Sequence, residues 1–159
     1  MEGFVRAVAS VPGNQRAARA PFGAMVLIHA TAVETGGAFG MWETFTPPGQ
    51  GPLPHIHTRE TEVFRVVRGT YRFTCGGETF DAPPGTVVTL PPNIEHDWVN
   101  ISDEEGQMFA IVTPGGFEQL FIAIEAAGAD TPEKIAEIEA GLGIINAHTR
   151  RLAIGAEAT

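Results

Sequence analysis

The tripeptide His55-Ile56-His57, followed five residues later by Glu62, is the stretch that most constrains how this chain folds. Side chains alternate between the two faces of an extended strand, so both histidines lie on the same face. A short polar turn separates them from Glu62, whose carboxylate can return to that face from the next strand. His96 is a fourth candidate from later in the chain. Together these residues predict a metal site inside a β-barrel.

The predicted ligand set consists of three imidazole nitrogens and one carboxylate oxygen. We expect one divalent transition metal ion, and the donor set leaves its identity open among Fe, Ni, Mn, Co, Cu and Zn. Closed structural zinc sites usually contain cysteine, and the single cysteine, Cys75, lies outside this pattern. An open site of this kind favours catalysis over structural bracing. A site that only binds a ligand is the alternative.

Turn-forming residues divide the chain up to about residue 114. Nineteen glycines and twelve prolines fall mainly between short apolar runs, which is typical of strands joined by tight turns. About eight or nine such strands predict an all-β double-sheet jelly roll or barrel. Besides the His-x-His strand, the predicted strands are 24–31, 39–46, 62–68, 70–75, 78–81, 86–90, 95–100 and 107–113.

The pattern changes after residue 114. Apolar residues recur at helical spacing across 116–128, which predicts an amphipathic helix. Asp130 is predicted to cap a second helix, which Gly141 would end. His148 is expected to be exposed to solvent. We expect these helices to close one end of the barrel; alternatively, Phe117 and its neighbours also line the mouth of a pocket.

The composition fits one globular domain with a small-molecule partner. Ten basic and nineteen acidic residues give a net charge of −9, which argues against nucleic acid or an anionic membrane as the main partner. No apolar run approaches the roughly 18 residues of a membrane span. Residues 1–14 lack the features of a signal peptide, so we expect a cytoplasmic protein. The lone Cys75 leaves no intramolecular disulfide.

The chain resembles the cupins. Their first motif, G-x5-H-x-H-x4-E-x6-G, is matched at every fixed position, and their second motif is matched in a common variant in which the histidine comes later than in the strictest form. The matching residues are Gly49, His55, His57, Glu62 and Gly69 in the first motif, and Gly77, Pro83, Pro84, Gly85, Pro91, His96 and Asn100 in the second.

This resemblance implies a double-stranded β-helix, the jelly-roll cupin barrel, over residues 21–114. Residues 115–159 would form a short α-helical tail packed on the barrel, and a homodimer is expected. Residues 1–20 would form an N-terminal arm. The arm either ends in a short strand that pairs with another subunit or is a loosely ordered terminus.

Within the family, residues 115–121 (GGFEQLF) and the later helix are similar to single-domain quercetin 2,3-dioxygenases. That likeness implies metal-dependent oxidative ring cleavage of a flavonol or another enolisable aromatic small molecule, with O2 as the oxidant. His55, His57 and His96 would hold the metal. Glu62 would be a further ligand and the general base for the substrate hydroxyl.

Two other classes of function stay open. One is a non-redox metal-dependent cupin, such as an isomerase or a polyketide cyclase, and the other is a non-catalytic small-molecule binding protein. Strand parity places Arg65 outside the barrel. Large aromatic side chains are candidate substrate contacts, and the alternative is that they fill the barrel core. These candidates are Phe64, Phe73, Trp98 and Phe109.

Overall fold

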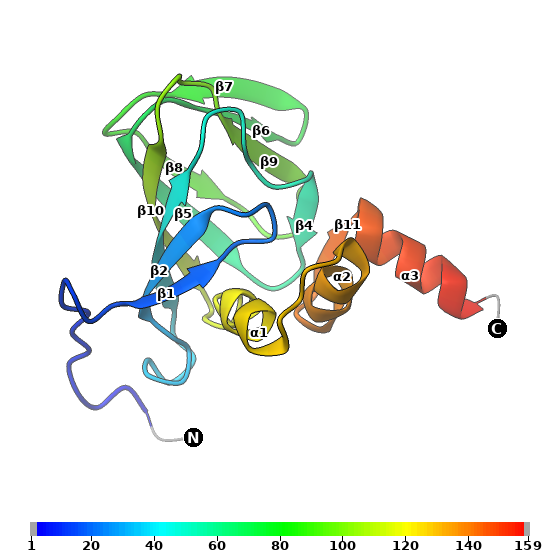
Figure 1. Cartoon of the computed structure of the whole chain (residues 1–159), viewed down its shortest axis with the longest axis horizontal. Helices are drawn as coiled ribbons and strands as arrows, with labels where there is room; N and C mark the ends of the chain where they lie inside the picture. The colour runs from blue at the N-terminus through cyan, green and yellow to red at the C-terminus, as the bar shows by residue number, and fades with distance from the viewer. Residues whose placement is uncertain (1–2, 158–159) are drawn as a thin grey trace.

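The computed structural model describes residues 3–157 and shows two antiparallel sheets followed by a helical C-terminal segment (Figure 1). The first sheet contains, in spatial order, β1 (Arg16–Arg19), β2 (Met25–Ala30), β3 (Gly40–Thr46), β10 (Gly106–Thr113), β5 (Thr61–Arg68) and β8 (Val87–Leu90). The second contains β11 (Ile144–Asn146), β4 (His55–His57), β9 (His96–Asn100), β6 (Tyr71–Cys75) and β7 (Glu78–Ala82). The fold is the predicted all-β jelly-roll barrel with a C-terminal helical tail.

The core lies between the two sheets, because the long strands bury every second side chain. On β10, Met108, Ala110 and Val112 are fully buried, and the residues between them are partly exposed. Strand β5 alternates in the same way and buries Glu62, which places a carboxylate inside the barrel. The same parity leaves Arg65 exposed, as predicted.

The eight predicted strands are all present, and their ends differ from the prediction by one residue at most. The expected N-terminal arm contains β1, which pairs with β2 of the same chain. Before it, the ring of Phe4 packs edge-on against Phe39, with 6.0 Å between the ring centroids. Residues 1–2 of the expected arm and 158–159 of the expected tail lie outside the described residues.

The first helix of the tail agrees with the prediction. Helix α1 (Gln119–Ala127) buries Leu120, Phe121 and Ile124, which lie on one face. It ends at Gly128, whose left-handed backbone (φ 56°) is the conformation that glycine adopts most readily after a helix.

The second helix, α2 (Pro132–Gly141), has a different N-cap from the predicted Asp130. Thr131 is the cap, and its Oγ1 accepts a hydrogen bond from the backbone N–H of Lys134. Thr131 takes this place because it has an extended backbone and precedes Pro132, which favours the first helical position. Asp130 instead forms an exposed ion pair with the Lys134 ammonium group.

The end of the chain contains two elements that the sequence did not predict, strand β11 and helix α3 (Ala147–Glu157). Strand β11 extends the second sheet by pairing antiparallel with β4, the strand that contains His55 and His57. A strand of three residues is too short to show a period in the sequence. Figure 1 shows α1 and α2 below the barrel, and α3 projecting from its side.

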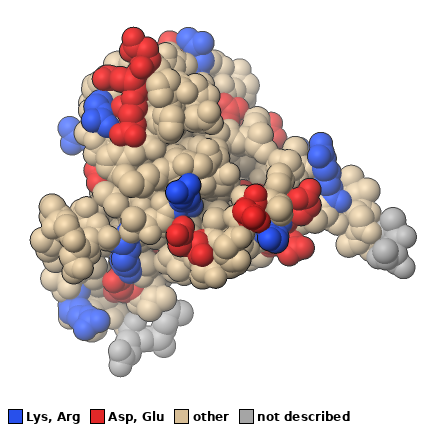
Figure 2. All heavy atoms as spheres, in the orientation of Figure 1, with Lys and Arg blue, Asp and Glu red and all other residues tan. Residues whose placement is uncertain are grey.

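In the described part of the chain, no helix combines the length and the apolar character needed to cross a membrane. Figure 2 shows the Lys and Arg side chains of one face scattered among acidic ones, without a continuous basic patch among the described residues in view.

Candidate metal centre

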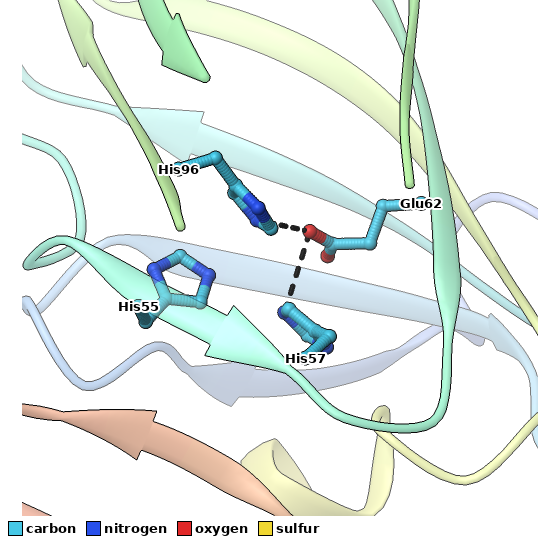
Figure 3. A group of neighbouring side chains, drawn as sticks. All are labelled: His55, His57, Glu62 and His96. Carbon is cyan, nitrogen blue, oxygen red and sulfur yellow. Dashed lines mark hydrogen bonds and ion pairs between the residues drawn. The ribbon is translucent and has the colours of Figure 1, made fainter. Parts of the chain in front are cut away.

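Four buried side chains from both sheets meet inside the barrel, as the sequence predicts (Figure 3). His55 and His57 come from β4, His96 from β9 and Glu62 from β5. Each offers one ligand atom, and these atoms all lie within 4.8 Å of one another. The three imidazoles therefore project from the second sheet toward a carboxylate of the first.

The strand pairing explains this convergence. His55 and His96 are direct partners in the antiparallel pairing of β4 with β9, so their side chains lie on the same face. His57 shares that face because it is two residues from His55. Their ring centroids are 4.5 Å apart for His55 and His96, and 5.1 Å apart for His55 and His57.

Backbone carbonyls fix the orientation of two of the imidazoles. Nδ1 of His55 lies 2.7 Å from the carbonyl oxygen of Leu53, and Nδ1 of His96 lies 3.1 Å from that of Ile94. A carbonyl only accepts hydrogen bonds, so each Nδ1 is the donor. In neutral imidazoles this leaves the Nε2 lone pair of each ring directed into the cluster.

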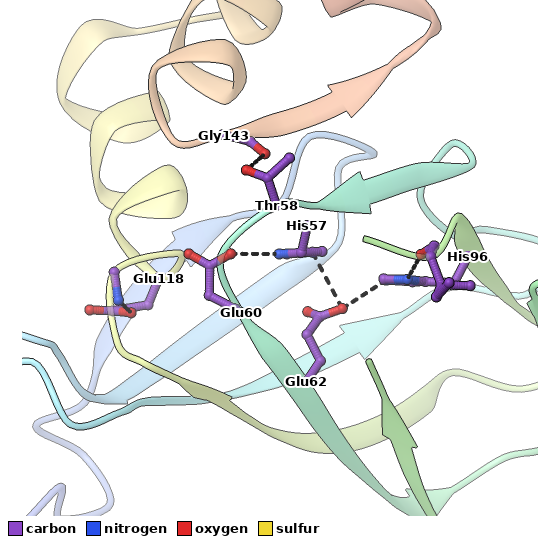
Figure 4. Close-up of polar contacts among 9 residues, drawn as sticks. His57, Thr58, Glu60, Glu62, His96, Glu118 and Gly143 are labelled. Atoms are coloured by element: carbon purple, nitrogen blue, oxygen red, sulfur yellow. Dashed lines mark hydrogen bonds and ion pairs between the residues drawn. The ribbon is translucent and has the colours of Figure 1, made fainter. Parts of the chain in front are cut away.

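A second buried carboxylate orients His57. Its Nδ1 lies 3.2 Å from Glu60 Oε2, and its Nε2 lies 3.3 Å from Glu62 Oε2 (Figure 4). The first contact is a hydrogen bond. The second lacks hydrogen-bond geometry, so this fully buried Nε2 has no hydrogen-bond partner among the described residues. Buried nitrogens are rarely left in this state, and a metal ion would supply the missing partner.

Burial and charge act on the pKa values of the cluster. Burial lowers the pKa of His55 to about 4, so its imidazole is neutral at neutral pH. Burial also disfavours the charged form of His57, but Glu62 and Glu60 outweigh it and raise that pKa. Burial opposes ionisation of Glu62, yet the nearby histidines lower its pKa. The cluster thus favours an ionised carboxylate, which is the form that binds metal.

These observations fit one metal ion held by His55, His57, Glu62 and His96. The donor set has no cysteine and uses imidazole and carboxylate, which suits the first-row divalent ions. Glu62 Oε2 lies 2.9 Å from His96 Nε2, so these two candidate ligand atoms are direct neighbours in the cluster. Glu60 completes the centre from outside by holding the tautomer of His57.

A cavity of about 380 Å³ reaches this centre. Its wall is mainly apolar and comes from both sheets and from the C-terminal segment, so the tail both covers the barrel and shapes the pocket. Among the described residues, no Lys or Arg side chain lines it. The lining includes Val26, Trp42, Thr44, His55, Glu62, Phe64, Trp98, Phe117, Phe121, Ile135, Glu139, Ile144, Asn146 and His148.

The structure divides the four predicted substrate contacts into two groups. Phe64 and Trp98 line the cavity. Phe73 is fully buried outside the lining and packs behind Phe64, with 5.9 Å between the ring centroids. The prediction that Phe109 contacts the substrate is wrong, because Phe109 lies on the outer face of β10 and stacks on His29. Parity explains this error, since Met108 and Ala110 occupy the inner face.

Sequence reasoning missed four polar residues of this region. Glu60 lies inside the first motif, at one of the four unspecified positions before Glu62. Glu139 has a signal in the sequence, because it is four residues after Ile135 and so falls on the apolar side of α2. Thr44 and His148 had no such signal. His148, expected to be exposed, is half-buried and lines the cavity.

Comparison with known proteins agrees with this fold and site. Residues 42–112 match the family model described as "Cupin domain". A quercetin 2,3-dioxygenase from Aspergillus japonicus is 31% identical over 110 residues, which cover 65% of this chain and 31% of that protein. The matched region thus spans about a third of that relative's length.

Two solved structures share the fold. KdgF from Halomonas sp. superposes with a TM-score of 0.63 at 17% identity, covering 72% of this chain and 99% of the other. An RmlC-like cupin from Shewanella frigidimarina superposes with a TM-score of 0.61 at 16% identity, covering 70% and 94%. At these identities the likeness concerns the barrel alone.

Proposed function

Residues 42–112 of this chain are a cupin domain, and from that premise we propose that the protein is a metal-dependent dioxygenase that cleaves a flavonol or a similar enolisable aromatic molecule. The observation that carries the proposal is the junction of the metal centre with a largely apolar cavity. His55 and Glu62 belong to both. A flat aromatic substrate in this cavity would place one edge beside the four candidate metal-binding residues.

Each residue has a distinct part in this proposal. His55, His57 and His96 hold the metal, and Glu62 is the fourth ligand. A bound divalent metal would supply positive charge that stabilises an enolate and orients the reactants. Glu62 Oε2 is the proton acceptor for the enolic hydroxyl, since it is buried, ionised and located at the cavity.

The aromatic wall serves to orient the ring and to exclude water. Trp98, Phe64 and Phe117 line the cavity, and the Phe117 ring centroid is 4.4 Å from that of His57. Large apolar rings next to an ionic cluster lower the local dielectric constant, which strengthens the electrostatic interactions of the site.

Oxygen consumption tests the proposal. Purified protein is stripped of metal, reloaded separately with Fe, Ni, Mn, Co, Cu or Zn, and mixed with quercetin under an oxygen electrode. We expect oxygen uptake together with loss of the flavonol absorbance for at least one redox-active ion. Binding of quercetin without oxygen uptake for every ion would overturn the dioxygenase and favour a binding protein or a non-redox enzyme.

The Glu62→Gln variant separates the base role from the ligand role. We expect it to lose turnover by roughly a hundredfold or more, as general bases typically contribute, while elemental analysis still finds metal. Turnover equal to that of the wild type would show that Glu62 is not the general base. The Arg65→Gln variant, changed at an exposed, outward-facing position of the same strand, is the control and keeps full activity.

Location and assembly belong to the same proposal. We propose a cytoplasmic homodimer whose partner is a small molecule, together with O2. Multi-angle light scattering of the purified protein gives the mass directly. A mass equal to that of one chain would contradict the proposed homodimer and leave the proposed reaction unaffected.

A further inference from the structure

The cavity contains two polar groups that the metal centre does not use. Thr44 Oγ1 on β3 is buried and has no hydrogen-bond partner among the described residues. Glu139 on α2 is also buried, and none of the described residues hydrogen-bonds to its Oε1. Both residues line the cavity, one on the barrel wall and the other on the C-terminal segment. Buried polar groups nearly always have partners, so the Thr44 hydroxyl, together with Glu139 Oε1, is available to hydrogen-bond a ligand in the cavity.

Asn146 holds Glu139 in place. Its Oε2 accepts a hydrogen bond of 2.7 Å from Nδ2 of Asn146. Oδ1 of Asn146 in turn accepts from the backbone N–H groups of His148 and Thr149, at 2.9 and 3.0 Å. The carboxyl group therefore has a fixed position, with one oxygen used by the protein and the other left for the cavity.

The charges of the lining restrict the ligand. The lining includes the acidic residues Glu62, Glu139 and Asp130, the last of which pairs with the exposed Lys134, and no Lys or Arg of the described chain lines it. A phosphate or carboxylate on the ligand would have no basic side chain to pair with and would be repelled by the ionised carboxylate of Glu62. The cavity therefore selects a ligand without an anionic substituent away from the metal.

We propose that Thr44 and Glu139 form a second polar contact that selects neutral, polyhydroxylated aromatic ligands by hydrogen-bonding hydroxyl groups not held at the metal centre. This inference rests on the proposed function, whose substrate class it narrows. Burial raises the pKa of the Glu139 carboxyl, which favours a form able to donate as well as accept. The Thr44 hydroxyl can likewise do both.

Two flavonols test the inference, because they share the metal-binding hydroxyl and carbonyl groups and differ only in their other hydroxyls. They are 3-hydroxyflavone and quercetin, titrated by fluorescence against zinc-loaded protein. Zinc has no redox chemistry, so binding is measured at equilibrium without oxidation. We expect the wild type to bind quercetin more tightly. Thr44→Val and Glu139→Leu should each reduce this preference by roughly tenfold, the usual cost of a lost buried hydrogen bond.

The controls separate recognition from structure. Thr44→Val keeps the side-chain shape, and Glu137→Leu makes the same substitution as Glu139→Leu on the exposed side of α2 and should leave the preference unchanged. If both variants at the cavity weaken the two flavonols equally, or change neither affinity, the inference is overturned.

The oxygen assay keeps the two proposals distinguishable. A lost preference in the variants, combined with no oxygen uptake by any metal-loaded form, would support the polar contact and overturn the dioxygenase. Oxygen uptake together with an unchanged preference for quercetin in the variants would support the dioxygenase and overturn the polar contact. If neither flavonol binds the zinc-loaded protein, both proposals fail.

Discussion

Asn146 lies directly opposite His55 in the antiparallel pairing of β11 with β4. The C-terminal segment is therefore joined, residue by residue, to the strand that contains two of the candidate metal ligands. A hydrogen bond of 2.6 Å from Thr58 Oγ1 to the carbonyl oxygen of Gly143 strengthens this junction (Figure 4). Through Asn146, the same segment also holds Glu139 at the cavity.

Metal binding should stabilise the fold. A ligand that binds only the folded state adds about 2.7 kcal/mol at a concentration one hundred times its dissociation constant. We expect a rise in the thermal midpoint when zinc is added to the metal-free protein, and loss of that rise in His96→Ala. His29→Ala, which changes a histidine outside the cluster, should keep it. An equal rise in His96→Ala would place the metal elsewhere.

Glu60 should set metal affinity without binding the metal. It holds the Nδ1 proton of His57, and removing such partners typically lowers metal affinity by about 10–100-fold. We expect this loss in Glu60→Ala, measured by competition with a chromophoric chelator. Glu60→Gln keeps an acceptor oxygen and should recover much of the affinity. Unchanged affinity in Glu60→Ala would show that the tautomer of His57 is fixed without this contact.

Gly143→Ala should weaken the attachment of the C-terminal segment. Gly143 has a φ of 78°, and an added Cβ would lie 2.5 Å from Thr58 Oγ1. We expect a loss of roughly 1–3 kcal/mol in the free energy of unfolding, with faster amide hydrogen exchange across β11. Gly141→Ala, two residues earlier, meets no atom within 4 Å and should not destabilise the protein. Equal exchange rates in the two variants would contradict the predicted strain.

Glu139 should make the stability of the metal-free protein depend on pH. Burial raises its pKa, so above its unfolded value of 4.5 the folded state holds this proton more tightly than the unfolded chain. Its contribution is therefore complete below that value and is lost as the pH rises through the folded-state pKa. Glu139→Gln cannot ionise and should gain stability relative to the wild type as the pH rises above about 4.5, measured by urea unfolding. A constant difference would mean that Glu139 titrates normally.

The local sequence was sufficient for the barrel and for the convergence of the four candidate ligands. Alternation of apolar residues fixes which face of a strand is buried, and glycine and proline fix where strands end, so the eight predicted strands were found within one residue. The same period placed His55 and His57 on the inner face of β4, and Arg65 on the outer face of β5. The fixed spacing of the first motif then identified Glu62 as their partner, and a variant of the second motif identified His96.

What only the tertiary structure decided depends on contacts between distant segments. Nothing near Asn146 in the sequence shows that it lies opposite His55, because a three-residue strand forms only when another strand offers free backbone groups. Glu60 and Glu139 became parts of the site through the side chains that face them, His57 and Asn146. Phe109 was misplaced because a strand inside a sheet has two faces, and hydrophobicity alone does not say which face meets the cavity.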